Sequence, residues 1–154
     1  MAGAEPVVRR LRDDDLPALL RLYAFLHIGA TPAGAQVAAE TWARICANPD
    51  LHYLGVEVDG ELVASCTIAI IPNLTNGARS YGLIENVVTH PDHRKRGFGT
   101  AVLHAANQIA WEQGCYKVML MTGRKDAATL RFYASAGFES GIKTAFLARR
   151  PAHE

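Results

Sequence analysis

The sequence predicts an α/β fold: one domain with a mixed central sheet and helices on both faces. Apolar, strand-like segments alternate with segments whose apolar residues recur at helical spacing. The second half of the chain reads strand, helix, strand, helix, strand, an order that implies a partly parallel sheet. A length of 154 residues favours one hydrophobic core, so residues 1–154 are expected to form a single domain.

Each element is predicted from local signals. Asp13–Asp15 is a cluster that favours the start of a helix, Asp59-Gly60 favours a hairpin turn, and Gly114 ends a helix. A short strand is expected to begin at residues 7–8. Further strands are expected over residues 51–57, 62–71, 81–89, 116–121 and 138–148. Helices are expected over residues 16–26, 36–46, 97–113 and 127–136, with a loop over 72–80.

Composition excludes several classes of protein. Sixteen Lys and Arg residues oppose 15 Asp and Glu residues, and a formal net charge of +1 argues against a nucleic-acid binder. No apolar run approaches the roughly 20 residues of a membrane span, and the first residues lack a signal-peptide core. Cys46, Cys66 and Cys115 have no metal-site or disulfide spacing, so we expect core thiols of a cytoplasmic protein.

The most informative segment joins a buried strand to three consecutive cations and two glycines. Arg94, Lys95 and Arg96 precede Gly97 and Gly99, where an amphipathic helix begins. Glycine permits tight turns, and a helix start leaves about four N–H groups unpaired. Together these features predict an anion cradle suited to a pyrophosphate. By spacing alone, a glycine-rich turn beside a solvated basic loop explains the pattern equally well, because the P-loop and dinucleotide-binding patterns are absent.

Three segments resemble the GNAT superfamily of N-acetyltransferases. The Arg-x-x-Gly-x-Gly pattern of Arg94–Gly99, after the strand residues Glu85–Val88, is similar to the acetyl-CoA motif of that family. Phe132–Phe138 resembles its second signature, and Arg10–Leu16 its first strand and helix. The resemblance spans nearly the whole chain. It implies a GNAT-type domain that uses acetyl-CoA as co-substrate and needs no metal.

The resemblance also implies which residues bind acetyl-CoA. Main-chain groups of Val87, Val88 and Thr89 would pair with the pantetheine arm. Asp126 stands where many members carry an Asn that bonds the pantetheine or a water, and Thr129 replaces a common Ala, so this turn is expected to differ. Loop amides would hold the pyrophosphate, and the residues of that loop are Arg94, Lys95, Arg96, Gly97, Phe98, Gly99 and Thr100.

Glu85 and Tyr133 are the expected catalytic residues. A primary amine with a pKa near ~10 must lose a proton before it attacks a thioester, and a carboxylate near a strand bulge can take it. Glu85 resembles the carboxylate so placed in glucosamine-phosphate N-acetyltransferases; a substrate-binding or structural role remains an alternative. Tyr133 stands where the family commonly places the general acid for the CoA thiolate; a packed aromatic is the alternative. His90 and His93 have no third ligand nearby and predict no metal site.

The expected function is acetyl transfer from acetyl-CoA to a primary amine of a small molecule, by direct attack in a ternary complex. The alternatives are a protein N-acetyltransferase, a non-catalytic acyl-CoA sensor and an anion-binding module. Neither a basic surplus nor an extra docking segment favours a protein acceptor, while Glu85 and Tyr133 favour catalysis. Neither nucleic acid nor a membrane is an expected partner. We expect a homodimer, because an unpaired apolar strand at Thr144–Ala148 would expose a sheet edge.

Overall fold

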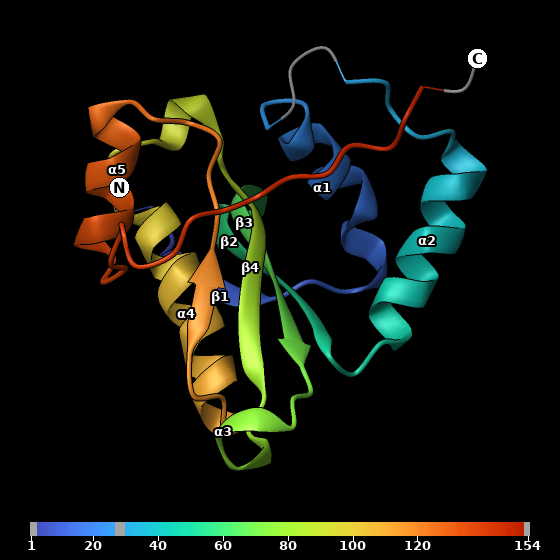
Figure 1. Ribbon diagram of the computed structural model, residues 1–154. Coiled ribbons are helices and arrows are strands. Elements are labelled where there is room, and N and C mark those ends of the chain that lie inside the picture. Colours follow the sequence, from blue (N-terminus) through green and yellow to red (C-terminus); the bar gives the residue numbers. More distant parts are fainter. Residues whose placement is uncertain (1–2, 27–29, 153–154) are drawn as a thin grey trace. The chain divides into compact units, whose positions relative to one another are not determined.

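The computed structural model describes residues 3–26 and 30–152 (Figure 1). The chain forms two compact units, Met1–Leu120 and Met121–Glu154. The first unit contains the whole sheet, and the second contains one helix followed by an extended tail. The residues that the sequence predicts for the site are divided between the two units.

The sheet has five strands in the order β1-β2-β3-β4-β5. Antiparallel pairing joins the first four strands, and β5 runs parallel to β4, so the sheet is mixed as predicted. The strands are β1 Val7–Arg10, β2 Leu51–Val58, β3 Glu61–Ile71, β4 Tyr81–Thr89 and β5 Val118–Leu120.

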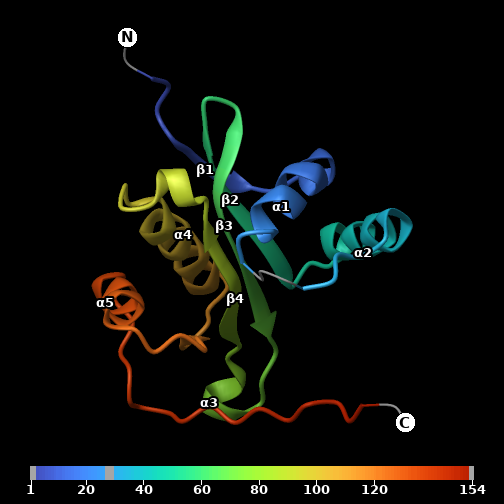
Figure 2. The same cartoon turned by 90° about the horizontal axis from the view of Figure 1, so that it is seen from above.

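Helices cover both faces of this sheet. In Figure 2, α4 lies on one side of the sheet, and α1 and α2 lie on the other. This arrangement confirms the predicted fold class. The helices are α1 Leu16–Tyr23, α2 Ala35–Ala47, α4 Phe98–Glu112 and, in the second unit, α5 Ala127–Ser135. Short turns occur at η1 Asp13–Asp15, α3 Thr75–Ala78 and η2 Pro91–His93, and α3 contains left-handed backbone.

Packing on both faces buries β3 almost throughout. One core cluster lies beneath α1 and α2, where Leu19, Leu22 and Trp42 pack with Leu62 and Val88. On the opposite face the Cys66 thiol donates to the Val102 carbonyl of α4, with a sulfur–oxygen distance of 3.5 Å. A strand covered on both faces needs a continuous apolar sequence rather than an alternating one. This explains the run of buried residues in β3.

An ion-pair network fixes the start of α1. The Asp15 carboxylate accepts two hydrogen bonds from the Arg9 guanidinium, at 2.7 and 2.9 Å, and a third from the Arg12 amide, at 2.6 Å. Glu57 of β2 accepts from Arg9 Nε at 3.0 Å. The adjacent Arg9 holds the pKa of Asp15 below its ordinary value. The aspartate cluster therefore begins the helix as predicted, and it also ties that helix to the sheet.

The predicted strand over 138–148 is wrong. Residues 138–152 contain a bend at 141–143 and form no strand, and they pair with no strand among the described residues. Ile142, Phe146 and Leu147 are 67%, 92% and 78% exposed. An apolar, strand-like sequence forms a strand only where a neighbour takes its backbone hydrogen bonds, and nothing within the second unit does so.

Other differences from the predicted elements are smaller. Helix α1 ends at Tyr23 rather than near residue 26, and β5 covers three residues rather than six. Cys66 and Cys115 are buried as expected, whereas Cys46 is exposed. Cys46 lies near the end of α2, a helix of which only Ala38 and Trp42 are buried, so an apolar residue type does not indicate burial there.

Candidate active site

Strand β4 has an open edge along its second half. The parallel pairing with β5 joins Gly82 to Val118 and ends where Ile84 meets Leu120. Strand β4 itself continues to Thr89. Its edge beyond Ile84 therefore has no strand partner among the described residues, and backbone N–H and C=O groups there are available to a ligand.

Glu85 lies at the beginning of this open edge, directly before a bulge. Glu85 pairs with Thr67 of β3, and Val88 pairs with Ser65. Two residues of β4, Asn86 and Val87, therefore lie opposite one residue of β3, Cys66. Asn86 has a φ of +53°, which non-glycine residues rarely adopt. Glu85 is exposed. Bulges redirect side chains and release backbone groups from the ladder, and this one does so beside the predicted base.

The loop after β4 turns through two left-handed residues before α4 begins. Lys95 has a φ of +62° and Gly97, the N-cap of α4, has a φ of +83°. No side chain caps this helix, so its first N–H groups keep their capacity to bind an anion. Gly97 therefore makes the turn that its residue type predicts. Gly99, by contrast, lies buried inside the first helical turn.

The three cations of the loop are exposed, and neighbouring rings hold one of them. Arg96 donates to His93 Nδ1 at 3.1 Å, and its guanidinium lies 5.1 Å from the centre of the Phe98 ring. The Phe98 side chain is itself buried. Arg94 and Lys95 extend the positive charge beside the helix start. Exposed cations and an uncapped helix start therefore lie next to each other in the first unit, and the anion cradle stays a prediction at these residues.

Asp126 and Thr129 together form the N-terminal cap of α5. Asp126 Oδ2 accepts from the Thr129 amide at 3.0 Å, and the Thr129 hydroxyl lies 2.9 Å from both carboxylate oxygens. Arg124 donates to Oδ1 at 3.1 Å. The Thr129 hydrogen bonds hold the pKa of Asp126 below its ordinary value. This pair therefore has a capping role that the sequence reasoning did not assign.

Tyr133 is half-buried on α5 between two other aromatic residues. Its ring centre lies 4.9 Å from that of Phe132 and 6.5 Å from that of Phe138. These contacts fix the ring, as the packed-aromatic alternative requires, and they also suit a hydroxyl that must be held in one place. Tyr133 belongs to the second unit, and Glu85 to the first.

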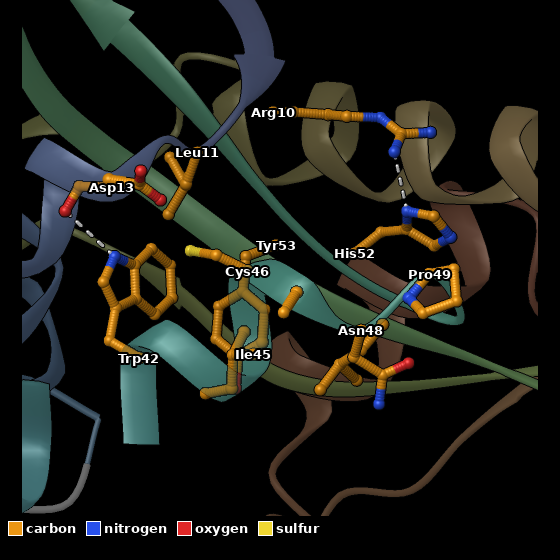
Figure 3. Close-up of a pocket in the computed structure, with 12 residues that line it drawn as sticks. Arg10, Leu11, Asp13, Trp42, Ile45, Cys46, Asn48, Pro49, His52 and Tyr53 are labelled. Carbon is orange, nitrogen blue, oxygen red and sulfur yellow. Dashed lines mark hydrogen bonds between the residues drawn. The ribbon is translucent and has the colours of Figure 1, made fainter. Parts of the chain in front are cut away.

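A cavity of about 290 Å³ lies elsewhere, among β1, α2 and β2 (Figure 3). Its walls include Trp42, Tyr53 and Cys46, and neither Glu85 nor the cradle contributes to it. Three of the polar side chains in its wall already have partners: Arg10 donates to His52 Nδ1 at 2.9 Å, and the Trp42 indole donates to a backbone carbonyl. Burial lowers the pKa of His52. We do not assign the chemistry to this cavity.

Sequence reasoning did not find the left-handed residues Asn86 and Lys95. Asn is one of the few non-glycine types enriched at positive φ, so an Asn inside an otherwise apolar strand was the available signal for the bulge. Lys95 carried no such signal. Among the described residues, no group of three or more His, Cys, Asp and Glu side chains is placed to hold a metal ion. No helix in that part of the chain is long and apolar enough to cross a membrane.

Comparison with protein families identifies the architecture. Residues 16–138 match the model of the acetyltransferase (GNAT) family. The chain belongs to the GNAT family. A glucosamine 6-phosphate N-acetyltransferase of Trypanosoma brucei brucei is 32% identical over 133 residues, which cover 86% of this chain and 88% of that protein.

Solved structures agree with this GNAT assignment. A putative acetyltransferase from Agrobacterium tumefaciens superposes with a TM-score of 0.89 at 42% identity, over 94% of this chain and 99% of that one. The glucosamine-6-phosphate N-acetyltransferase of Arabidopsis thaliana gives a TM-score of 0.82 at 19% identity, over 96% and 99%, and shows the shared fold. The protein is an acetyl-CoA-dependent N-acetyltransferase, as its sequence predicts.

Proposed function

We propose that this GNAT enzyme transfers the acetyl group of acetyl-CoA to the primary amine of a small molecule, by direct attack in a ternary complex. One observation carries the proposal: exposed Glu85, the open edge of β4 and the uncapped start of α4 follow in this order along the chain, with one loop between β4 and α4. This order supports a site in which a proton acceptor, a strand edge and an anion cradle serve one extended co-substrate.

The binding role falls to backbone groups. Val87, Val88 and Thr89 lie on the open edge, and the Val88 side chain is buried in the core, so main-chain atoms are what this residue offers a ligand. The loop from Arg94 to Thr100 supplies amides for the pyrophosphate, and the left-handed Lys95 and Gly97 support that role. The exposed cations add screened attraction.

The proton steps fall to two side chains. Acetyl-CoA supplies a thioester carbonyl, and the ammonium form of the acceptor cannot attack it. Exposed Glu85 forms no ion pair with a described residue, so its carboxylate is available to take the proton from the amine. Tyr133, with its ring held by two aromatic neighbours, donates its hydroxyl proton to the departing thiolate.

Amino sugar phosphates are the first acceptors to test. The trypanosomal relative, at 32% identity, is named for glucosamine 6-phosphate. Acetylation of a protein N-terminus or lysine is the competing outcome, and a balanced formal charge of +1 gives no reason to favour it.

We also propose that the enzyme is a cytoplasmic homodimer. The exposed Phe146 and Leu147 lie in an extended segment that pairs with no strand in the described part of the chain, and a second copy would supply one. Three free cysteines agree with a reducing compartment. A monomeric mass by light scattering at tens of micromolar protein would contradict the dimer.

The test measures CoA thiol release with acetyl-CoA and a panel of amines, including glucosamine 6-phosphate, simple aminoglycosides and lysine peptides. We expect turnover with a small amine and none with the peptides. Glu85→Gln keeps the shape of the side chain and should lower kcat by roughly 10²–10⁴-fold. The loss should shrink as pH rises, because free amine becomes abundant without a base.

The matched control is Glu61→Gln, an exposed glutamate at the start of β3, which should leave kcat unchanged. If Glu85→Gln alters only the KM of the amine, Glu85 is a substrate contact and not the base. Turnover with peptides alone would replace the small-molecule acceptor with a protein.

A further inference from the structure

The bulge beside Glu85 is a strained element that something must hold in place. Asn86 adopts a left-handed conformation in the middle of a strand, and the two bulge residues directly follow Glu85. Non-glycine residues keep such backbone only where their surroundings enforce it. The direction of the Glu85 side chain depends on this conformation, because a change at Asn86 alters the strand on which Glu85 lies.

Two buried hydroxyl groups face the same side of the sheet as Glu85. Thr67 lies directly opposite Glu85 on the neighbouring strand, so both side chains point to one face. Cys66, the residue before Thr67, contacts α4, and successive strand residues point to opposite faces, so Thr67 faces α1. Tyr23 lies on α1, which packs against β3 and β4.

Both hydroxyl groups lack a partner. Tyr23 Oη and Thr67 Oγ1 are shielded from solvent, and neither makes a hydrogen bond with a described residue. The whole of Thr67 is only 5% exposed. Buried hydroxyls without partners are rare in folded proteins, because they give up water and gain nothing in exchange. A phenylalanine and a valine would pack in the same spaces without that cost.

The nearby polar group that suits both hydroxyls is the side chain of Asn86. Asn86 directly follows Glu85, the residue that pairs with Thr67, and α1 packs against both β3 and β4. Burial raises the pKa of the Tyr23 phenol, and the Thr67 and Asn86 side chains oppose that rise, which agrees with this proximity. A carboxamide has two donor hydrogens and an acceptor oxygen, so one Asn can accept from one hydroxyl and donate to the other.

We propose that Tyr23 and Thr67 are positioning residues, whose buried hydroxyls hold the Asn86 carboxamide and thereby aim Glu85 at the acceptor amine. The inference rests on the proposed role of Glu85 as the base. Tyr23 and Thr67 touch neither substrate, since their oxygen atoms have no exposed surface. They act through the backbone of the bulge.

Kinetics of Tyr23→Phe and Thr67→Val test this proposal, with Tyr81→Phe as the matched control. Tyr81 begins β4 at its other end, so its variant loses a hydroxyl far from the bulge. We expect Tyr23→Phe to lower kcat about tenfold, with a smaller loss for Thr67→Val, and to change the KM of acetyl-CoA less than about twofold. The loss should diminish at high pH, as it does for Glu85→Gln, which a general packing defect would not produce.

A double-mutant cycle separates this inference from the proposed function. In the Glu85→Gln background, Tyr23→Phe should cost nothing further, because both changes remove the same aimed carboxylate. Losses that multiply would overturn the inference, as would full activity of Tyr23→Phe. If Glu85→Gln itself retains full activity, the assignment of the base fails, and the inference about its positioning fails with it.

One measurement does not depend on the acceptor. In ¹⁵N,¹³C-labelled protein, the HN–Hα coupling and the Cα shift of Asn86 report its left-handed backbone. We expect both to move toward extended values in Tyr23→Phe and to stay unchanged in Tyr81→Phe. Wild-type Asn86 signals in Tyr23→Phe would overturn the inference even if no amine in the panel were acetylated.

Discussion

The two helices that carry the signature motifs begin in opposite ways. Helix α4 begins at the left-handed Gly97 and has no side-chain cap, whereas α5 begins at Asp126, whose carboxylate accepts from the Thr129 amide. A helix start either satisfies its own N–H groups or leaves them to water or a ligand. The first turn of α4 therefore has N–H groups that no side-chain cap occupies, whereas in the first turn of α5 the Thr129 N–H is already bonded to Asp126.

This difference suits the proposed roles, in which α4 binds the co-substrate and α5 carries a catalytic group. A capped helix is the better support for a catalytic side chain, because its first turn is held by its own hydrogen bonds, and α5 carries Tyr133. An uncapped helix with cations beside it is the better anion site, and α4 has Arg94 and Lys95 there. Substitutions at the two helices should consequently give different kinetic signatures.

The largest effect is expected at α5. Tyr133→Phe keeps the ring and its aromatic contacts but removes the proton, so kcat and kcat/KM should fall together, by about 10²-fold, the low end of the range for general acids. The KM for acetyl-CoA should stay nearly constant. Wild-type turnover in a Tyr133→Phe variant with an unchanged melting curve would show that Tyr133 is a packed aromatic residue and not the general acid.

At α4 the expected signature is the reverse. Gly97→Val has room for its side chain but must keep a φ of +83°, so the turn of the cradle should rearrange. We expect the KM for acetyl-CoA to rise by at least about tenfold. The matched control is Gly114→Val, which has a φ of +75° and equally open surroundings at the other end of the helix. Gly114→Val should lower Tm and leave the KM for acetyl-CoA unchanged. An equal rise of this KM in both variants would show that backbone strain, and not the loss of the cradle, causes the rise.

The cap of α5 gives the next prediction. Asp126→Ala removes the acceptor of the Thr129 hydrogen bonds and should lower Tm. If Asp126 also contacts the pantetheine arm, as the family resemblance implies, the KM for acetyl-CoA rises several-fold as well. Asp126→Asn, which preserves a capping oxygen, should leave both values close to wild type. A drop in Tm with constant KM would limit Asp126 to capping.

The smallest effect is expected for the exposed cations. Arg94→Ala should raise the KM for acetyl-CoA about two- to fivefold at low salt, since a charge in water acts weakly and over roughly 10 Å. The effect should nearly vanish at about 1 M salt. Arg96→Ala should retain part of its effect, because Arg96 also packs on the Phe98 ring. A salt-independent loss at Arg94 would indicate a direct hydrogen bond instead.

Much of the fold was predictable because its signals are local. Apolar periodicity predicted the strands and helices of the first unit, and the Gly97 turn followed from its residue type. The structure of segment 138–148 was not predictable, because an apolar, strand-like sequence does not reveal whether a partner strand lies beside it. For the candidate site, the sequence predicted the strand that carries Glu85 and the loop of Arg94–Gly99, while the roles of these residues stay predictions. The left-handed Asn86 at the bulge and the Tyr23–Thr67 pair were not predicted, because they depend on which residues three separate elements bring together.

Acetyl-CoA binding to the intact protein tests most directly whether the open edge of β4 and the start of α4 form the co-substrate site. A ligand that binds only the native state at a hundred times its Kd should stabilise it by about 2.7 kcal/mol. We predict a clear rise in Tm for the wild type and for Gly114→Val, and little or none for Gly97→Val at the same concentration. A Tm that acetyl-CoA leaves unchanged, while inorganic phosphate or NAD raises it, would contradict this assignment.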